Sequence, residues 1–237
     1  VYGLTKFKNG EENIQNHIEN RFRDIGYTVK SKILYASDFG VPQRRNRLFI
    51  VGNRNGIDFE FPKEFDYSVS VDEAISDLPV LGNGEIQMKG EYTVPFEQAS
   101  PYAQLMRKKS KAPTQNIVSR NKDYVVERYK YIGQGENWSS IPDRLMENYA
   151  DKKRCHSGIY KRLIGGKPSV VISNYRKSML IHPHQDRGLS VREAARLQSF
   201  PDHFIFEGPV SYVQQQIGNA VPPLLAKAVM KKILTYK

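Results

Sequence analysis

The residues with the most evident chemistry stand in the stretch GVPQRRNRLFIVGN, at positions 40–53. Gln43, Arg45 and Arg47 occupy alternate positions, so on an extended chain their side chains share one face. Guanidinium groups stay charged and present planar donors, which suits them to hold a phosphate or an oxygen on which negative charge develops. The apolar run that follows is typical of a buried strand. A plain cluster of surface arginines at a strand end is the alternative interpretation.

A second candidate site is the stretch QIGNAVPPLLA at positions 216–226. Pro222 and Pro223 suit the first turn of a helix, so Asn219 is expected at a turn that opens the last helix. Helix N-termini favour anionic ligand groups. An ordinary Asn helix cap is the alternative.

Cysteine and histidine offer little further chemistry. Cys155 is the single cysteine, which excludes an internal disulfide and fits a cytoplasmic location. Its context, KKRCHSG, gives it no evident role. His156, His182 and His184 come without cysteine or carboxylate ligands at zinc-site spacing, so no metal is expected.

The charge of the chain points to its partner. The formal net charge is +11 and the pI is about 9.6, values that favour nucleic acid. A merely basic protein, or weak duplex binding by charge alone, is the alternative. No apolar run approaches the roughly 20 residues that span a bilayer, so no membrane partner is expected.

Regular elements are predicted near both ends of the chain. Helices with a recognisable start or stop are expected from Asn9 to Gly26, from Ser70 to Pro79, from Ser190 to Pro201, and from Pro222 onward. Glu73 and Glu193 stand three residues after their serine caps and complete capping boxes. The stretch at 27–37 and the strand that ends at Gly52 are expected to pair antiparallel. Residues 80–181 show no such order and predict an irregular, mostly surface-built domain.

Three stretches, 35–52, 187–204 and 216–226, resemble in order the late motifs of the DNA cytosine-5 methyltransferases. The first contains the family's Gln-x-Arg-x-Arg pattern, and the third contains Gly-Asn-Ala-Val-Pro-Pro. The resemblance spans essentially the whole chain and is weakest across 80–181. It implies an enzyme that flips a cytosine out of duplex DNA and transfers a methyl group from S-adenosylmethionine to carbon 5.

The resemblance also implies roles for single residues. Arg47 is expected at the cytosine oxygen, Arg45 at phosphate and as a brace of the pocket, and Gln43 as the residue that fixes both. The turn that lies against the methionine part of the cofactor corresponds to Asn219, Ala220 and Val221. Arg187 and Glu193 belong to the motif that supports the recognition domain, and an amphipathic packing helix is an equally good description of it.

Residues 80–181 correspond to the target recognition domain, which reads double-stranded DNA through the major groove. The basic residues expected to contact DNA are Arg120, Arg154, Lys161, Arg162, Arg176 and Lys177. The clusters HSGIYKRL at 156–163 and SNYRK at 173–177 are the first to test. Which bases they contact does not follow from the sequence, because loop geometry decides which side chains reach a groove.

The sequence also departs from the family pattern. The Gly-rich cofactor motif and the Pro-Cys nucleophile motif have no counterpart, and Val1–Leu4 is similar to the tail of the Glu-Asn-Val motif. The chain is therefore expected to be the C-terminal part of a prokaryotic restriction-modification methyltransferase, inactive alone and dependent on an N-terminal half or on self-association. A non-catalytic, sequence-specific DNA-binding module or specificity subunit is the alternative.

The expected fold class is α/β. Residues 1–79 and 182–237 would form the C-terminal portion of a doubly wound, Rossmann-like methyltransferase sheet, and 80–181 an irregular, mostly β and loop recognition domain. A sheet without its early strands has an open edge, which a partner is expected to cover.

Overall fold

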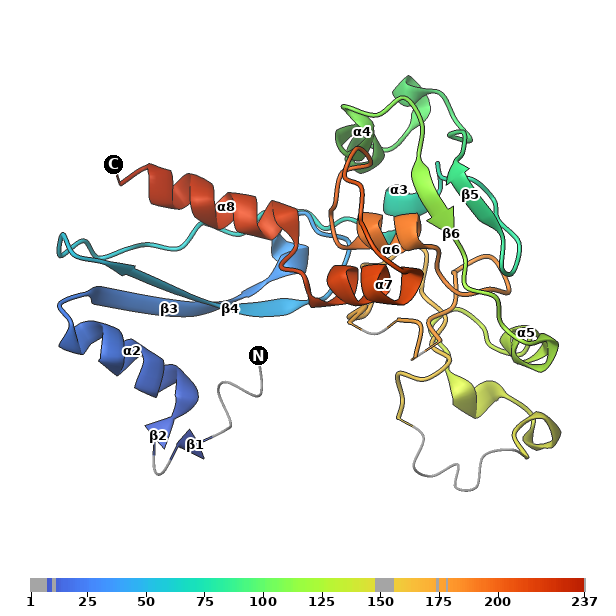
Figure 1. Cartoon of the computed structure of the whole chain (residues 1–237), viewed down its shortest axis with the longest axis horizontal. Helices are drawn as coiled ribbons and strands as arrows, with labels where there is room; N and C mark the ends of the chain where they lie inside the picture. The colour runs from blue at the N-terminus through green and yellow to red at the C-terminus, as the bar shows by residue number, and fades with distance from the viewer. Residues whose placement is uncertain (1–7, 10–11, 148–155, 174, 178, 237) are drawn as a thin grey trace.

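The computed structural model describes the chain except for residues 1–7, 10–11, 148–155, 174, 178 and 237. Two bodies lie side by side (Figure 1). The first contains the long strand pair β3–β4 with helices α2 and α8, and the second contains the remaining helices and the short strands β5 and β6. Arg154, which was predicted to contact DNA, lies outside the described residues, as do Cys155 and Val1–Leu4.

The first body is built on the predicted antiparallel pair. β3 (Thr28–Tyr35) and β4 (Asn46–Asn53) pair along their whole length. A 3-10 turn, Ala36–Phe39, follows β3 and ends at Gly40. The φ of Gly40 is +74°, a left-handed conformation that glycine adopts without strain. The pairing predicted from the sequence is therefore confirmed.

Two helices flank this pair on opposite sides (Figure 1). α8 (Pro223–Leu234) begins at the predicted proline pair and packs Leu225 and Val229 into a small core with Leu34 and Phe39. α2 (Ile14–Asp24) covers the other side.

The predicted start of α2 at Asn9 is wrong. Lys8–Asn9 (β1) and Glu12–Asn13 (β2) form a short antiparallel pair instead, and Asn13 accepts a hydrogen bond from the Asn16 N–H to cap the helix. Asparagine is a favourable N-cap at either position, so residue type alone does not exclude the later start.

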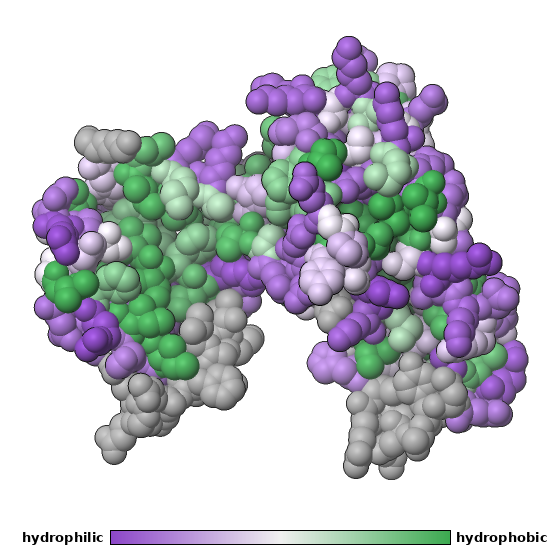
Figure 2. Space-filling view, viewed as in Figure 1, coloured by the Kyte–Doolittle hydropathy of each residue, from purple (hydrophilic) through white to green (hydrophobic). Residues whose placement is uncertain are grey.

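The extent of the sheet also differs from the prediction. Within the described residues, the strands form three separate two-stranded sheets, and no doubly wound sheet is present. β4 has no fully buried residue, because its apolar side chains are only half covered. Figure 2 shows hydrophobic side chains gathered over the strand pair between α2 and α8. A two-stranded sheet is marginal alone, so this surface is suited to further packing.

The second body has a mixed core. Its elements are α3 (Val71–Ile75), β5 (Ile86–Lys89), α4 (Pro101–Arg107), β6 (Thr114–Ile117), α5 (Asp123–Tyr129), α6 (Val191–Leu197) and α7 (Val210–Asn219), with 3-10 turns at Phe96–Gln98, Trp138–Ser140 and Asp143–Leu145. One hydrophobic cluster contains residues from α3, α6 and α7 together with residues from 80–181. Packing therefore joins the segments on both sides of the boundaries predicted near 80 and 181.

The predicted capping boxes of α3 and α6 are both present, at Ser70–Glu73 and Ser190–Glu193. α6 ends at Leu197, earlier than the predicted stop at Pro201. The sequence patterns did not predict α7.

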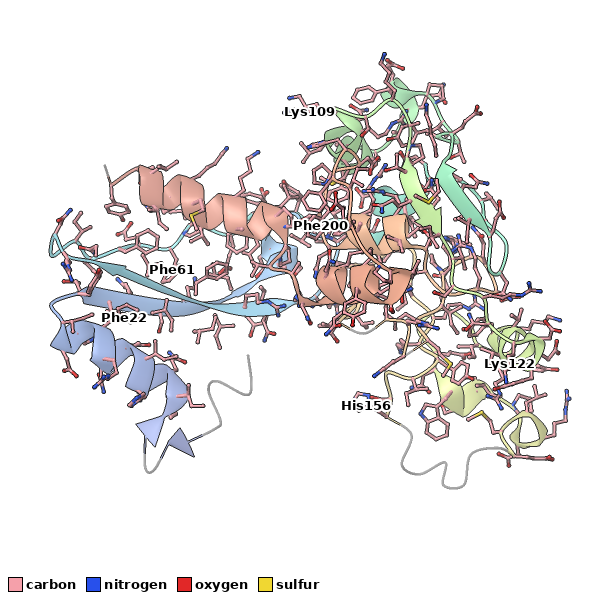
Figure 3. All side chains as sticks on the ribbon, viewed as in Figure 1. Phe22, Phe61, Lys109, Lys122, His156 and Phe200 are labelled. Atoms are coloured by element: carbon pink, nitrogen blue, oxygen red, sulfur yellow. The ribbon has the colours of Figure 1, made fainter. Side chains whose placement is uncertain are left out.

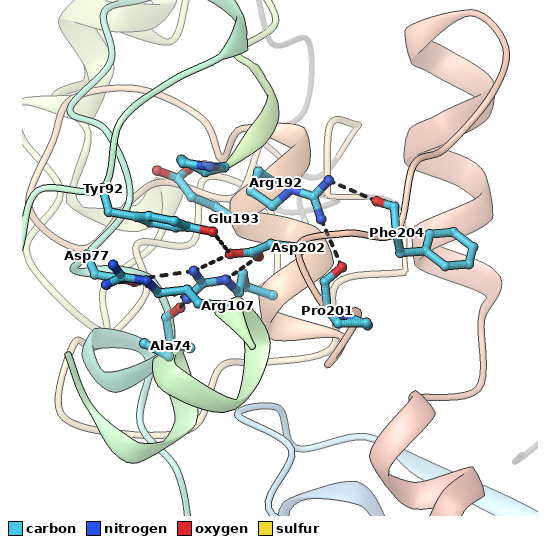
Figure 4. A network of polar contacts seen from close by, with 12 residues as sticks. Ala74, Asp77, Tyr92, Arg107, Arg192, Glu193, Pro201, Asp202 and Phe204 are labelled. Atoms are coloured by element: carbon cyan, nitrogen blue, oxygen red, sulfur yellow. Dashed lines mark hydrogen bonds and ion pairs between the residues drawn. The ribbon is translucent and has the colours of Figure 1, made fainter. Parts of the chain in front are cut away.

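A buried charge network ties α6 to the rest of the second body (Figure 4). Arg196 is fully buried, and its guanidinium contacts Asp202 at 2.6 Å and Asp77 at 3.0 Å. Arg107 joins through Asp77 and stacks on the Tyr92 ring, 3.8 Å from its centroid. Asp77 and Arg196 are 119 residues apart in the chain, so no local pattern predicts their contact.

Candidate functional site

The predicted arginine cluster meets the predicted cofactor turn at the C-terminus of α7. Arg45 Nη2 donates to the Gly218 carbonyl at 2.6 Å. Arg47 Nη2 donates to the carbonyls of Asn219 and Ala220 at 3.4 and 3.2 Å. The last carbonyls of a helix lack intrahelical donors and carry the negative end of its dipole, so two guanidinium groups are well matched to them. The structure thus brings together two motifs that are distant in the sequence.

Only some of the hydrogen-bond donors of Arg45 have partners. Its side chain is 3% exposed, yet its Nε and Nη1 atoms have no hydrogen-bond partner among the described residues. No described carboxylate forms an ion pair with it. A buried guanidinium with no ion pair and with two unpaired nitrogen atoms is costly, which favours an acceptor that comes from a ligand or from another segment of protein.

Gln43 is anchored beside this cluster through a second glutamine. It is fully buried and donates to Gln198 Oε1 at 2.7 Å and to the Leu197 carbonyl at 3.1 Å. Gln198 in turn donates to the Ile217 carbonyl at 2.6 Å. The side-chain oxygen of Gln43 accepts from the Ile172 N–H at 3.2 Å. One amide pair therefore connects the ends of α6 and α7 to a segment of the predicted recognition domain.

Gly218 allows α7 to approach the same segment. A Cβ atom at this position would lie 1.8 Å from the Ser173 carbonyl oxygen. Any side chain other than hydrogen would force these backbones apart. This contact gives a physical reason for glycine in the Gly-Asn-Ala-Val-Pro-Pro stretch.

The turn at Asn219–Val221 differs in position from the prediction. Asn219 is the last residue of α7, and the next helix begins only at Pro223. The Asn219 and Val221 side chains are exposed, while Arg47 holds two carbonyls of the turn. The turn therefore presents one polar and one apolar side chain beside a fixed positive charge.

Arg187 and Glu193 form a bidentate pair at the start of α6. The two Nη–Oε distances are 2.8 and 2.7 Å, and each side chain is 1% exposed. Burial alone raises the pKa of Glu193, but the Arg187 charge and its hydrogen bonds outweigh burial and lower that pKa to about 2. The pair is therefore buried and structural in its geometry.

The basic residues expected to contact DNA fall into two groups. Arg120, Arg176 and Lys177 are exposed, and Lys161 is half-buried with its Nζ donating to the Gly135 carbonyl. Arg162 is buried and donates to four backbone carbonyls and to Asp186. Its guanidinium has no donor to spare, so its geometry fits a structural role and not a DNA contact.

The histidines lie apart from the arginine cluster. His184 Nε2 is 2.8 Å from Asp72 Oδ1, and His182 is buried beside Glu193. In the described part of the chain, no group of three or more His, Cys, Asp or Glu side chains is arranged to hold a metal ion. None of the described helices combines the length and the apolar character needed to span a membrane.

Sequence reasoning missed the role of Gln198 and the exposure of Val170 and Val171. Gln198 lies within the helix expected from Ser190 to Pro201, and a glutamine on a buried face signals a hydrogen-bonding need. Val170 and Val171, in the stretch PSVVIS, are exposed in an irregular segment, which no pattern described above predicts.

Comparison with known proteins gives a consistent result. Residues 1–235 match the family of C-5 cytosine-specific DNA methylases. The chain is 35% identical over 219 residues to the type II methyltransferase M1.HphI of Haemophilus parahaemolyticus, covering 92% of this chain and 50% of that one. It is 32% identical over 258 residues to the type II methyltransferase M.DdeI of Desulfomicrobium norvegicum, covering all of this chain and 61% of that one. The chain thus spans only half to three fifths of these relatives.

Solved structures support the same fold. A DNA modification methyltransferase encoded within an E. coli prophage superposes with a TM-score of 0.65 at 23% identity, covering 94% of this chain and 64% of that one. The methyltransferase EhMeth of Entamoeba histolytica superposes with a TM-score of 0.52 at 12% identity, over 95% of this chain and 59% of that one. The fold of the chain is therefore similar to that of α/β methyltransferases.

Proposed function

Because the chain belongs to the family of C-5 cytosine-specific DNA methylases, we propose that it is the C-terminal part of a restriction-modification DNA methyltransferase. Members of this family use S-adenosylmethionine as the methyl donor. The chain contributes the arginine half of the pocket for a flipped cytosine, one edge of the cofactor site and the region that recognises duplex DNA. The N-terminal half of the enzyme supplies the Pro-Cys nucleophile and the Gly-rich cofactor motif.

The observation that carries this proposal is the buried guanidinium of Arg45. Its Nε and Nη1 atoms lack partners within the described part of the chain, although they lie beside the arginine and turn residues that the resemblance assigns to catalysis. A buried cation with free donors is poised for an anionic or carbonyl acceptor. A DNA phosphate, the oxygen of a flipped base or a carboxylate of the N-terminal half each has that chemistry.

Arg47 and Gln43 complete the pocket in this proposal. Arg47 is half-buried, with Nη2 capping α7 and Nη1 donating to the Asn46 carbonyl, so part of the side chain remains accessible. This position suits a donor to the cytosine oxygen, where charge develops during attack on the ring. Gln43 holds the backbone that carries both arginines, because its amide is fully engaged in the buried core.

The turn at Asn219–Val221 fits one edge of an S-adenosylmethionine site. Asn219 provides an amide for polar groups, and Val221 provides an apolar contact, both exposed beside the fixed carbonyls. When bound, the cofactor supplies the methyl group. These residues bind and orient it, and the rest of its site belongs to the N-terminal half.

Two further observations support the need for that half. The chain spans 50% of one relative and 61% of another. The β3–β4 pair exposes a hydrophobic surface, seen in Figure 2, that the missing strands of a larger sheet would cover.

The proposal is tested by measuring transfer of a labelled methyl group from S-adenosylmethionine to duplex DNA. The chain alone should be inactive, and the chain mixed with an N-terminal half that carries the Pro-Cys and Gly-rich motifs should be active. Arg47→Ala should abolish that activity, whereas Lys109→Ala, an exposed residue beyond α4 (Figure 3), should not change it.

Methylation by the isolated chain would refute the need for a second half. The alternative, a non-catalytic DNA-binding module, predicts a different result. Sequence-specific DNA binding would then need no partner and would survive Arg47→Ala, while no mixture would methylate DNA.

A further inference from the structure

A wide cavity of about 1040 Å³ lies in the second body, where β5 and the loop after it face the end of α4. In Figure 1, α4 lies at the opposite end of this body from α5. Figure 3 places His156, which belongs to one of the two basic clusters, near that other end. No described residue that lines the cavity belongs to the arginine cluster, to the turn at 219–221 or to the residues expected to contact DNA. The cavity is therefore a separate feature of the molecule.

Arg107 is the buried cation beside this cavity. Its side chain is 7% exposed, and it forms part of the cavity wall together with Tyr92 and Val94. The guanidinium stacks on the Tyr92 ring, and its Nη1 atom donates to the Val94 carbonyl at 3.2 Å and to Asp77 Oδ2 at 3.4 Å. A stacked ring and two acceptors on one nitrogen fix the plane of the guanidinium.

Two of the three guanidinium nitrogens of Arg107 have no partner among the described residues. Nε is buried and makes no hydrogen bond. Nη2 makes none either, but it is not enclosed by protein, so it is the donor that is open to the cavity. A guanidinium carries five N–H donors, and a buried polar side chain is costly while its donors stay unpaired. This arrangement favours an acceptor in the cavity.

The charge of Arg107 is only partly compensated. Arg196 lies 3.0 Å from Asp77 and 2.6 Å from Asp202, so it is closely paired with both carboxylates. Arg107 reaches only Asp77, at 3.4 Å. Arg192 is a third buried arginine of this network (Figure 4), and it forms no ion pair with any residue that the structure describes. Two carboxylates thus serve three buried guanidinium groups, which leaves positive charge uncompensated in the network that borders the cavity.

Two lysines extend this positive charge over the cavity. Lys89 and Lys111 both line it and are both exposed, and their side chains make no hydrogen bond or ion pair with the described part of the chain. Glu91 is the one carboxylate among the described residues of the wall, and it is likewise exposed and unpaired there. Cations therefore outnumber carboxylates in the wall by about two, and the ligand that fits is an anion.

Phosphate is the anion that matches this set of side chains. Arginine offers planar donors to phosphate oxygens, and lysine binds phosphate as a point charge. A phosphate monoester carries about two negative charges at pH 7, which equals the excess in the wall. Each phosphate of a DNA backbone carries only one. The charge therefore favours a free phosphate or a monoester over the backbone of DNA.

We propose that this cavity binds a dianionic phosphate, either inorganic phosphate or the phosphate group of a small monoester. Arg107 donates to it from Nη2, and Lys89 and Lys111 hold its other oxygens. The bound anion supplies the negative charge that the buried arginine network lacks. The inference does not depend on the proposed function, because neither DNA nor methyl transfer enters it.

The test is isothermal titration calorimetry of the whole chain, at a fixed ionic strength set by chloride. The probes are inorganic phosphate and glycerol phosphate, and each should give saturable binding to one site. Tighter binding of the second would identify a monoester as the preferred source of the phosphate, and tighter binding of the first would identify free phosphate.

Two variants remove the proposed contacts. Lys89→Ala combined with Lys111→Ala should lower the affinity for both probes about tenfold, because two charge-assisted contacts are lost while the buried network stays intact. Arg107→Lys keeps the charge but loses the planar donors, so it should also lower the affinity about tenfold. Circular dichroism checks that each variant is folded, and the lysine variant decides the test if Arg107→Lys is not.

Lys109→Ala is the matched control, since Lys109 is an exposed cation two residues from Lys111 that does not line the cavity (Figure 3). It should leave the affinity unchanged. An equal loss in this control and in the double lysine variant would mean that net charge alone attracts phosphate, which overturns the inference. Absence of phosphate binding overturns it as well. Displacement of bound phosphate by duplex DNA without terminal phosphates would overturn the assignment to a small dianion.

Discussion

At the scale of single residues, the C-terminus of α7 is where the two predicted motifs meet. Its carbonyls are held by Arg45, Arg47 and Gln198, and Gly218 lets it touch the backbone at Ser173. The same few atoms therefore join the arginine cluster, the turn at Asn219–Val221 and the segment around Ser173. A small displacement here would alter all three.

Gly218→Ala should lower the free energy of unfolding by about 1–3 kcal/mol, because the new methyl group would overlap the Ser173 carbonyl and force the backbones apart. Urea denaturation measures the change. Gly166→Ala is the control, since a Cβ atom there meets nothing within 4 Å. Equal midpoints for the two variants would show that the contact does not exist.

Stability should also depend on pH through His182. Burial lowers the pKa of His182 to about 4, and its Nδ1 accepts from the His184 N–H, so protonation breaks that bond. Because the unfolded chain takes up this proton near pH 6.5 and the folded chain only near 4, stability falls as the pH drops through that window. The expected loss between pH 7 and pH 5 is about 2 kcal/mol.

Denaturation midpoints at the two pH values measure this loss, and His182→Gln should remove most of it. Glu193, which lies 3.7 Å from His182, affects stability only at lower pH. The pKa of Glu193 is lowered to about 2, so the stability from its Arg187 pair is present above about pH 4.5 and lost only below it. A pH-independent midpoint in the unmodified protein between 7 and 5 would contradict the assignment.

At the scale of elements, α6 is held by charge as well as by its apolar face. Arg196 neutralises Asp77 and Asp202 in the core, between α3 and the loop after α6 (Figure 4). Removing one partner of a buried pair leaves the others uncompensated, which costs more than the pair itself contributes.

Arg196→Met should therefore destabilise the protein by about 3–5 kcal/mol, measured by chemical denaturation. Lys130→Met is the matched comparison, because it breaks an exposed ion pair with Glu127 and should change the denaturation midpoint far less. Similar losses in the two variants would mean that the buried network is not a determinant of stability.

At the scale of the whole molecule, the two bodies differ in how completely they are covered. The second has a large mixed core, whereas the first is a two-stranded sheet between two helices with an apolar surface in view (Figure 2). An exposed apolar surface of this kind marks an interaction site.

The isolated chain should therefore bind a hydrophobic fluorescent dye and sediment as more than a monomer. Under the proposed function, addition of an N-terminal half should reduce the dye signal, because the strands of such a half would cover the surface. A monomer without dye binding, measured by sedimentation and fluorescence, would argue against a missing partner.

The sequence by itself determined the local features of this protein. The capping boxes of α3 and α6, the start of α8 and the pairing of β3 with β4 depend on residues within a few positions or on one connecting turn. Residue patterns report such short-range preferences directly. The family resemblance likewise followed from contiguous motifs.

Only the tertiary structure decided which distant residues meet. The approach of Arg45 to Gly218, the Gln43–Gln198 amide pair and the burial of Arg162 depend on packing between segments far apart in the chain. The choice between Asn9 and Asn13 as the cap of α2 was also made by strand pairing. Such contacts depend on how whole helices and strands pack around a core. Local residue patterns do not predict that packing.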